Sequence, residues 1–321
     1  VQSPTMQFAT GELTMADSNM SFYPEGLPAN RWRLFSIPGI IDSNEIKPND
    51  LEDGHVFYDW DPVAESWFKP DSIVIGRAYW FKHKYDEPVI FSNKDTTGYS
   101  VPLESYEIKL HQGANMVGSP FPFPVRAEWN EGVSQPYKYG SDLKEGWADT
   151  NVFEPWAGYA VQSTSDSGKI TFYPIQDTTI AARTANSGWR LNLDLSSNSS
   201  FDRTSAIGRC DACEENVDMN DMLLLPSLTQ RVFISLDIIN DGQFDYSKDL
   251  RSTSEFNGVW NMRVNRPNAE GSLTLKGAYE NDRPNDLVLM IVNVSTRGVL
   301  KNFPVESFEL SDTNSEFNDF K

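Results

Sequence analysis

The sequence predicts an all-β protein, made of a duplicated antiparallel β-module followed by an Ig-like or jelly-roll β-sandwich. Short segments of alternating apolar and polar residues recur along the chain, and no helical periodicity of useful length occurs in its first half. Turn-forming residues are frequent, with 20 Gly and 19 Pro among 321 residues, and aromatic residues make up 12%. This combination is typical of short strands packed in sandwiches or barrels.

An internal repeat is the second observation behind this prediction. The segment Trp32–Pro38 alternates and ends at a proline, and Asn115–Pro120 repeats that pattern with the prolines 120 − 38 = 82 residues apart. Further along each copy, Tyr79 and Tyr159 lie in similar apolar segments, 159 − 79 = 80 residues apart. Two nearly equal offsets indicate a duplicated unit.

Strands can be assigned along both halves from alternation and turn residues. The first half is expected to hold strands at 56–61, 72–75, 78–83, 88–92 and 106–110 before the second repeat begins. After the repeats, strands are expected at 189–195, 231–237, 258–264, 271–276, 286–293 and 307–310. Six or more strands at this spacing predict an antiparallel sandwich.

The domain boundary is predicted at residues 176–187, which are small and polar. Because no leader segment precedes Val1, we expect either a processed mature chain or a cut fragment. The predicted parts are an N-terminal strand or linker at 1–29, a duplicated β-domain at 30–175 (about 30–110 and 111–175), a β-sandwich domain at 188–311 and an acidic tail at 312–321.

The charge excludes one class of partner. The chain has 46 acidic and 27 basic residues, a formal net charge of −19, and a surface of this sign repels phosphate backbones. We therefore expect no nucleic-acid partner. No run of about 18 apolar residues occurs, so the sequence also predicts no membrane span.

Two groups of segments contain motifs with tryptophan, glycine and proline in a fixed order. The first group is Trp32 with Ser-Ile-Pro38, Tyr58-Asp-Trp-Asp61 with Trp67, Ile75-Gly-Arg-Ala-Tyr-Trp80 and Gly113–Phe121. The second group is Trp189-Arg-Leu-Asn-Leu193, Ile207-Gly-Arg209, Val259–Val264 and Ser272–Leu275. The first group resembles a module found in large secreted, sorting-domain-tagged surface proteins of bacteria, and the second group resembles the β-sandwich that often follows this module. The chain departs from the family pattern at Ala114, usually tryptophan, and at Ser119, usually asparagine. The resemblance implies export to the cell surface or the extracellular space and an accessory role, with no particular chemistry.

Motifs of common enzyme classes are not found in the sequence, and we expect no enzyme. The three histidines, His55, His83 and His111, are far apart and are expected to lie on the surface. The sequence contains no nucleophile elbow, Walker loop or dinucleotide-binding glycine motif. Carboxylate pairs for glycoside hydrolysis depend on distance in space, so a glycoside hydrolase stays open as a third alternative.

The two cysteines, Cys210 and Cys213, predict a local disulfide. Haem attachment would require a histidine at position 214, where the chain has Glu214, and a zinc ribbon would require a second cysteine pair. The acidic surroundings would also disfavour a reactive thiolate. An exported protein favours the oxidised pair.

Two acidic segments are candidates for binding calcium, which is the one cofactor that the sequence suggests. The candidate ligands are Asp211, Glu214, Glu215, Asp218 and Asp221 in the first segment, and Asp237, Asp241, Asp245 and Asp249 in the second. In the second segment, Ile239 and Lys248 stand where a calcium loop needs oxygen ligands, so a hairpin turn at Asp241-Gly242 is the competing interpretation.

The nine tryptophans favour either core packing or carbohydrate binding. Trp32, Trp80, Trp189 and Trp260 lie at alternating strand positions and are expected in the core. The remaining candidates lie beside turn residues and are expected to face a ligand: Trp60, Trp67, Trp147 and Trp156.

These observations predict a non-catalytic exported surface protein that acts in binding or in a self-assembling extracellular layer or filament. The alternative is a carbohydrate-binding accessory module. Expected partners are other copies of the chain, other surface proteins or a polysaccharide. Strand addition could use the edge of residues 1–29 or the acidic tail after Leu310.

Overall fold

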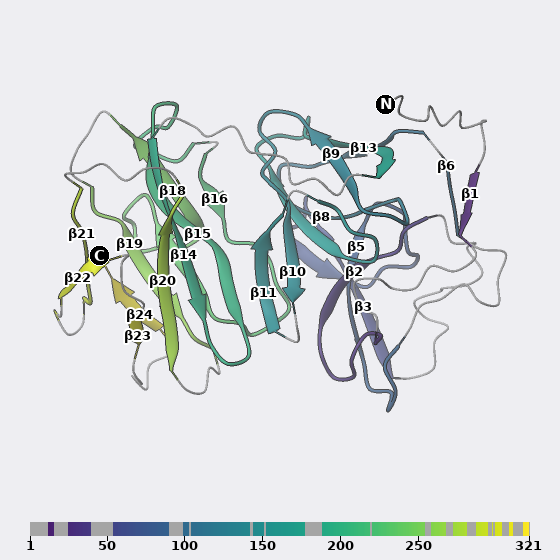
Figure 1. Ribbon diagram of the computed structural model, residues 1–321, viewed down its shortest axis with the longest axis horizontal. Helices are drawn as coiled ribbons and strands as arrows, with labels where there is room; N and C mark the ends of the chain where they lie inside the picture. Colours follow the sequence, from purple (N-terminus) through teal and green to yellow (C-terminus); the bar gives the residue numbers. More distant parts are fainter. Residues whose placement is uncertain are drawn as a thin grey trace, which may run out of the picture. The chain divides into compact units, whose positions relative to one another are not determined.

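The computed structural model shows a chain built from strands and turns (Figure 1). No helix occurs among the residues that the structure describes. The all-β prediction is thus confirmed. The described residues are 12–15, 25–39, 54–89, 99–102, 104–141, 144–150, 152–176, 188–218, 220–253, 258–267, 272–280, 287–294, 297, 299–303, 308–310 and 317–320.

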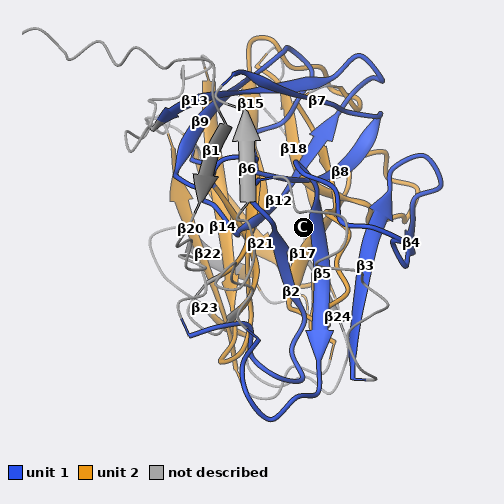
Figure 2. Cartoon of the chain, turned by 90° about the vertical axis from the view of Figure 1, so that its right-hand side faces the viewer, with its two compact units in different colours: residues 1–136, 150–181 blue, residues 137–149, 182–321 orange. Residues whose placement is uncertain are grey.

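The chain divides into two compact units (Figure 2). Unit 1 comprises Val1–Pro136 and Thr150–Ala181, and unit 2 comprises Tyr137–Asp149 and Ala182–Lys321. The division near residue 181 falls inside the segment expected as a boundary, most of which lies outside the described residues. Residues 137–149 differ from the expected organisation, because they lie within the second repeat along the chain but belong to unit 2.

The first repeat forms a four-stranded sheet in unit 1, with the order β2-β5-β3-β4. Alternating side chains of its strands fill a core that includes Phe35, Phe57 and Phe81, each exposed by 2% or less. The strands are β2 (Arg33–Ser36), β3 (His55–Asp61), β4 (Ser66–Phe68) and β5 (Ala78–His83).

The second repeat supplies strands β8 (Gly113–Gly118) and β12 (Gly158–Ser163), which pair antiparallel. A second core lies between these strands and a three-stranded sheet of order β7-β13-β9. That sheet consists of β7 (Tyr106–Lys109), β9 (Val125–Trp129) and β13 (Lys169–Gln176). Elsewhere in unit 1, β1 (Glu12–Met15) pairs with β6 (Tyr99–Pro102).

The pairing registers of the two repeats agree with the duplication. Phe35 pairs with Tyr79 in the first repeat, and Val117 pairs with Tyr159 in the second. These pairs are related by the offsets of 82 and 80 found in the sequence. Each tyrosine hydroxyl also accepts a hydrogen bond from the backbone N–H five residues earlier, at 2.7 Å for Tyr79 and 2.6 Å for Tyr159.

The two repeats interlock inside unit 1. The Ser36 hydroxyl donates to the carbonyl of Ala157 at 2.7 Å, and the Gly118 N–H donates to the carbonyl of Gly76 at 3.0 Å. Trp156, from the second repeat, is fully buried in the core of the first repeat. Each repeat therefore completes the packing of the other.

Unit 2 contains a nine-stranded sheet in which the order β23-β20-β14-β15-β18-β17-β19-β24 is joined by β16 beside β18. The pair β15 and β18 is parallel, whereas the sequence predicted antiparallel strands throughout. The strands are β14 (Gly188–Ser196), β15 (Phe201–Cys210), β16 (Met222–Leu223), β17 (Phe233–Asp237), β18 (Tyr246–Ser252), β19 (Asn261–Asn265), β20 (Leu273–Tyr279), β23 (Phe308–Leu310) and β24 (Phe317–Phe320).

Two hairpins complete unit 2. They consist of β10 (Tyr137–Ser141) with β11 (Lys144–Asp149), and of β21 (Leu289–Val292) with β22 (Val299–Phe303). The core of the unit contains Trp189, Leu191, Leu193, Ile234 and Val264.

The end of the chain contains a strand. Within the segment expected as an acidic tail, Phe317–Phe320 form β24 and pair antiparallel with β19 of the same chain. One edge of β24 is thus paired within the chain. Residues 311–316 lie outside the described residues.

Candidate functional site

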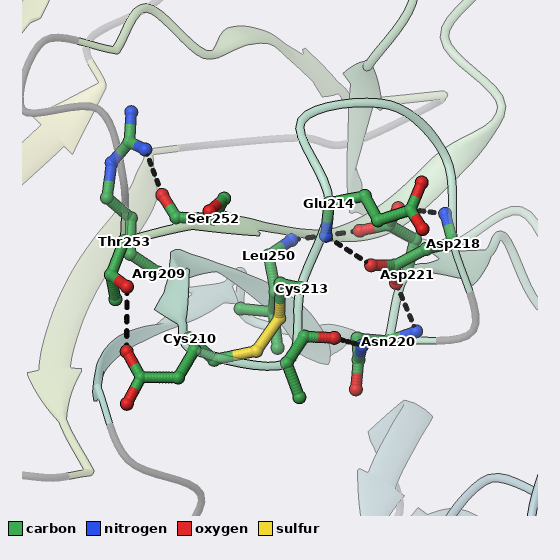
Figure 3. Close-up of a disulfide and its surroundings, with 12 residues drawn as sticks. Arg209, Cys210, Cys213, Glu214, Asp218, Asn220, Asp221, Leu250, Ser252 and Thr253 are labelled. Atoms are coloured by element: carbon green, nitrogen blue, oxygen red, sulfur yellow. Dashed lines mark hydrogen bonds between the residues drawn. A yellow bond between two sulfur atoms is a disulfide. The ribbon is translucent and has the colours of Figure 1, made fainter.

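The disulfide predicted from the sequence is confirmed. Cys210 ends β15 and is bonded to Cys213, and the Cys213 N–H donates to the Cys210 carbonyl at 3.3 Å (Figure 3). Both cysteines are buried against Leu250 of β18. The bond therefore closes a tight turn at the end of a central strand.

The acidic loop after the disulfide is held by its own carboxylates (Figure 3). Asp221 accepts the N–H of Asp218 at 2.9 Å and the N–H of Leu250 at 2.9 Å, which ties the loop to β18. Asp218 accepts the N–H of Glu214 at 2.6 Å and the N–H of Asn220 at 2.5 Å. Such bonds satisfy backbone donors that would otherwise be lost in a loop.

Burial raises the pKa of the Asp221 carboxyl from 3.8 to about 7. The two backbone hydrogen bonds oppose this rise, and the nearby charges of Asp249 and Asp218 add to it. Removal of the carboxylate from water is the dominant cause, because desolvation penalises the charged form.

Most of the other acids of the two candidate calcium segments also have protein partners. Asp211 accepts from the hydroxyl of Thr253 at 2.7 Å, Glu215 pairs with Arg209 at 2.9 Å, and Asp249 pairs with Arg251 at 2.8 Å. Asp237 accepts the N–H groups of Asp241 and Gly242, which forms the turn expected as the competing interpretation.

Neither calcium site is supported by this geometry. Within the described residues, no group of three or more His, Cys, Asp or Glu side chains is placed to hold a metal ion. The expectation was based on acids without basic neighbours in the sequence. In the structure, backbone N–H groups and the nearby side chains of Arg209 and Arg251 take the place of a cation.

Two arginines of the same region lie close to one ring. Arg209 of β15 and Arg251 of β18 are directly paired in register, and their guanidinium groups lie 5.7 and 5.2 Å from the ring centroid of Trp260. Both arginines are less than 10% exposed. Their pairing with Glu215 and Asp249 indicates a structural charge cluster.

Among the four tryptophans expected to face a ligand, two are corrected by the structure. Trp147 and Trp156 are fully buried, so neither presents a ring to solvent. Trp156 also adopts a left-handed backbone conformation, with φ of 68°, at the position equivalent to Gly76 in the first repeat. Nearby turn residues therefore did not indicate exposure.

Trp60 and Trp67 meet on the hairpin β3–β4 and are half-buried. Their ring centroids are 4.7 Å apart with an interplanar angle of 61°, and the Trp60 indole donates to the carbonyl of Ala114 at 2.8 Å. Tyr58, which the sequence did not single out, is half-buried on the same strand and lies 5.7 Å from Trp32. The period-2 alternation of β3 places Tyr58 and Trp60 on one face and could have identified the tyrosine.

This set of half-buried rings, Tyr58, Trp60 and Trp67, is named the aromatic hairpin and is the best candidate site. In the described part of the chain, β4 is the last strand of its sheet, with Ser66 and Phe68 exposed on either side of Trp67. The strand edge and the rings are thus both accessible to a partner. Trp32 also departs from its expected core position, since it is half-buried.

The histidines do not form a site. His83 was expected on the surface, but it is buried, and its Nε2 donates to the carbonyl of Leu27 at 2.7 Å while Nδ1 accepts from the N–H of Tyr85. His55 contacts the Tyr85 hydroxyl at 2.9 Å, and His111 lies 3.5 Å from Asp166 at the surface. His55 and His83, which are paired across strands β3 and β5, thus both contact Tyr85, whereas His111 contacts a different loop.

Comparison with protein-family models, curated proteins and solved structures finds no match for this chain. Among the described residues, none belongs to a helix with the length and apolar character needed to cross a bilayer.

Proposed function

We propose that this chain is a non-catalytic protein, exported to the cell surface or the extracellular space, that acts by binding or as part of a structural assembly. The aromatic hairpin is the observation that carries the proposal. It combines large rings with an accessible strand edge, and tyrosine and tryptophan are the residues that most often anchor protein interfaces.

The buried charged groups support a structural role rather than catalysis. Asp59 pairs with Arg77 at 2.5 Å, and burial raises the pKa of the Asp59 carboxyl although the arginine opposes the rise. Asp202 accepts bonds from the hydroxyls of Thr204 and Ser205 and from the N–H of Ile234. Carboxylates engaged in this way orient strands and loops.

Export is tested by treating intact producing cells with a protease and detecting the chain with an antibody. We expect the chain to be degraded on intact cells or to be recovered from the medium. A cytosolic enzyme is the control for cell integrity. Protection of the chain until the cells are lysed would contradict the proposal.

A carbohydrate-binding module is the second candidate function. Half-buried rings on a β-hairpin can stack on sugars, and Lys82 lies 5.7 Å from the ring of Trp32 near Tyr58. The steep angle between Trp60 and Trp67 lets only one of these rings lie flat on a sugar. Affinity electrophoresis in gels that contain cell-wall or exopolysaccharides tests this function. Retardation that disappears in Trp67→Ala would support it.

A further inference from the structure

The aromatic hairpin has a counterpart in the second repeat. The cross-strand pair Trp60 and Trp67 corresponds to the cross-strand pair Tyr139 and Trp147 of hairpin β10–β11, with 147 − 67 = 80. The ring centroids are 4.7 Å apart in the first pair and 5.0 Å in the second. The offset equals that of Tyr79 and Tyr159, so the two hairpins are equivalent elements of the duplication.

The two hairpins differ in burial. Tyr137, Tyr139 and Trp147 are exposed by 2% or less, whereas their counterparts Tyr58, Trp60 and Trp67 are half-buried. The equivalent rings are thus buried in the second repeat and half-buried in the first.

Hairpin β10–β11 is covered by loops of unit 2 that adjoin its β-sheet. Glu145 of β11 forms a parallel bridge with Ser200, which directly precedes β15, and the Glu145 N–H donates to the carbonyl of Ser199 at 3.1 Å. The hydroxyl of Tyr139 bonds to the hydroxyl of Thr229 at 2.6 Å. The segment that leads into a central sheet strand, and a hydroxyl group from a second loop of the same unit, therefore contact this hairpin.

We propose that the aromatic hairpin is a docking surface for a β-sandwich domain of another polypeptide, which covers Tyr58, Trp60 and Trp67 as unit 2 covers their counterparts. This inference rests on the proposed function and gives its binding activity a kind of partner. A second copy of the chain fits less well. In each copy the sheet surface at β15 already holds hairpin β10–β11, and two chains of net charge −19 repel each other.

The sequence of β4 defines how the partner approaches. Gly146 allows β11 to lie close to the carbonyl of Phe201, and a Cβ at this glycine would collide with that carbonyl. Its counterpart in β4 is Ser66, so a partner backbone must stay farther away at this point and contact the rings instead. Asp61 and Glu65 on the same hairpin favour a partner with basic side chains around its apolar contact.

The test uses the full chain in the organism that produces it, with Phe68 replaced by the photo-crosslinking residue p-benzoylphenylalanine. Phe68 is 40% exposed on β4. We expect irradiation to join it to a strand of a β-sandwich domain in another polypeptide, identified by sequencing the cross-linked peptide. The control is the same replacement at Val288, which is 73% exposed next to β21 in unit 2.

Two variants decide whether the contact is specific. Trp67→Ala should reduce the adduct about tenfold or more, as expected for an anchor ring at an interface. Ser66→Lys should give a similar loss without disturbing the core, because Ser66 is exposed and a lysine on an edge strand blocks strand approach. An unchanged adduct in Ser66→Lys would overturn the inference even if Trp67→Ala is poorly folded.

The remaining outcomes also overturn it. An adduct with a second copy would indicate self-association, an adduct with a polysaccharide would favour the carbohydrate function, and no adduct would leave the hairpin without a partner. Failure of this experiment is distinct from failure of the proposed function, since protease treatment of intact cells measures export whether or not the hairpin is occupied.

Discussion

Replacement of Gly118 by alanine should destabilise unit 1, because Gly118 lies where the two repeats interlock. A Cβ at this position would lie 2.0 Å from the Cβ of Ser36, 2.5 Å from its hydroxyl oxygen and 3.1 Å from the carbonyl oxygen of Arg77. Carbon atoms prefer about 3.5–4.0 Å, so the strands must move apart by more than 1 Å, roughly. We expect a loss of about 3 kcal/mol, the upper part of the range for overpacked cores.

The assay is urea unfolding of the full chain, followed by near-UV circular dichroism. With a slope of about 3 kcal/mol per molar urea, the expected loss moves the midpoint down by roughly 1 M. Ser36→Gly alone should cost about 1 kcal/mol, because it removes the hydrogen bond to Ala157.

The double variant Gly118→Ala/Ser36→Gly provides the decisive comparison. It removes the two atoms that the new methyl group would strike, so it should be more stable than Gly118→Ala alone. Contacting residues commonly show such coupling. An unchanged midpoint in Gly118→Ala, or additive losses in the double variant, would refute the interlocked arrangement of the repeats.

The remaining predictions concern unit 2. Burial raises the pKa of the Asp221 carboxyl to about 7, so the folded chain keeps a proton that the unfolded chain loses near pH 4. The free energy of unfolding should therefore fall by about 2–4 kcal/mol as the pH rises from 4 to 8. Asp221→Asn should flatten this dependence in thermal unfolding, and equal slopes in both chains would contradict the assignment. Reduction of the bond between Cys210 and Cys213 should cost about 2 kcal/mol or less, because the closed ring is short; a loss of cooperative unfolding in dithiothreitol would show a larger role. Calcium and a chelator should leave the melting temperature equal at fixed ionic strength, since most of the candidate carboxylates have protein partners, and a rise with calcium but not with magnesium would restore the calcium assignment.

The strand β14, which has one apolar face, could be predicted from the sequence, whereas β15 and β18 could not. The strand β14 alternates from Trp189 to Leu195, and its burial follows the same period. The strands β15 and β18 are buried on both faces yet contain Asp202, Lys248 and Asp249. Asp202 is compatible with burial because it accepts the N–H of Ile234, 32 residues away, and no local pattern reveals such a partner.

The same limit explains the errors at the candidate site. The loop after the cysteines was predicted to bind calcium because several of its carboxylates have no basic neighbour in the sequence, but Asp221 obtains its donors from backbone N–H groups, including that of Leu250, 29 residues away. The disulfide was predictable because two cysteines three residues apart can bond within one turn. Sequence patterns thus identified local chemistry, whereas long-range packing supplied one of the hydrogen-bond donors to Asp221.

The duplication shows most clearly how packing decides exposure. Trp67 and Trp147 occupy equivalent positions on equivalent hairpins, and each pairs with a ring across the strand. A rule based on neighbouring turn residues must treat them alike, yet Trp147 is buried by a strand more than 50 residues further along the chain while Trp67 stays half-buried. The covered copy therefore serves as an internal control for the accessible one. The proposed docking surface rests on this comparison, because the rings of hairpin β10–β11 are fully buried and the equivalent rings of hairpin β3–β4 are not.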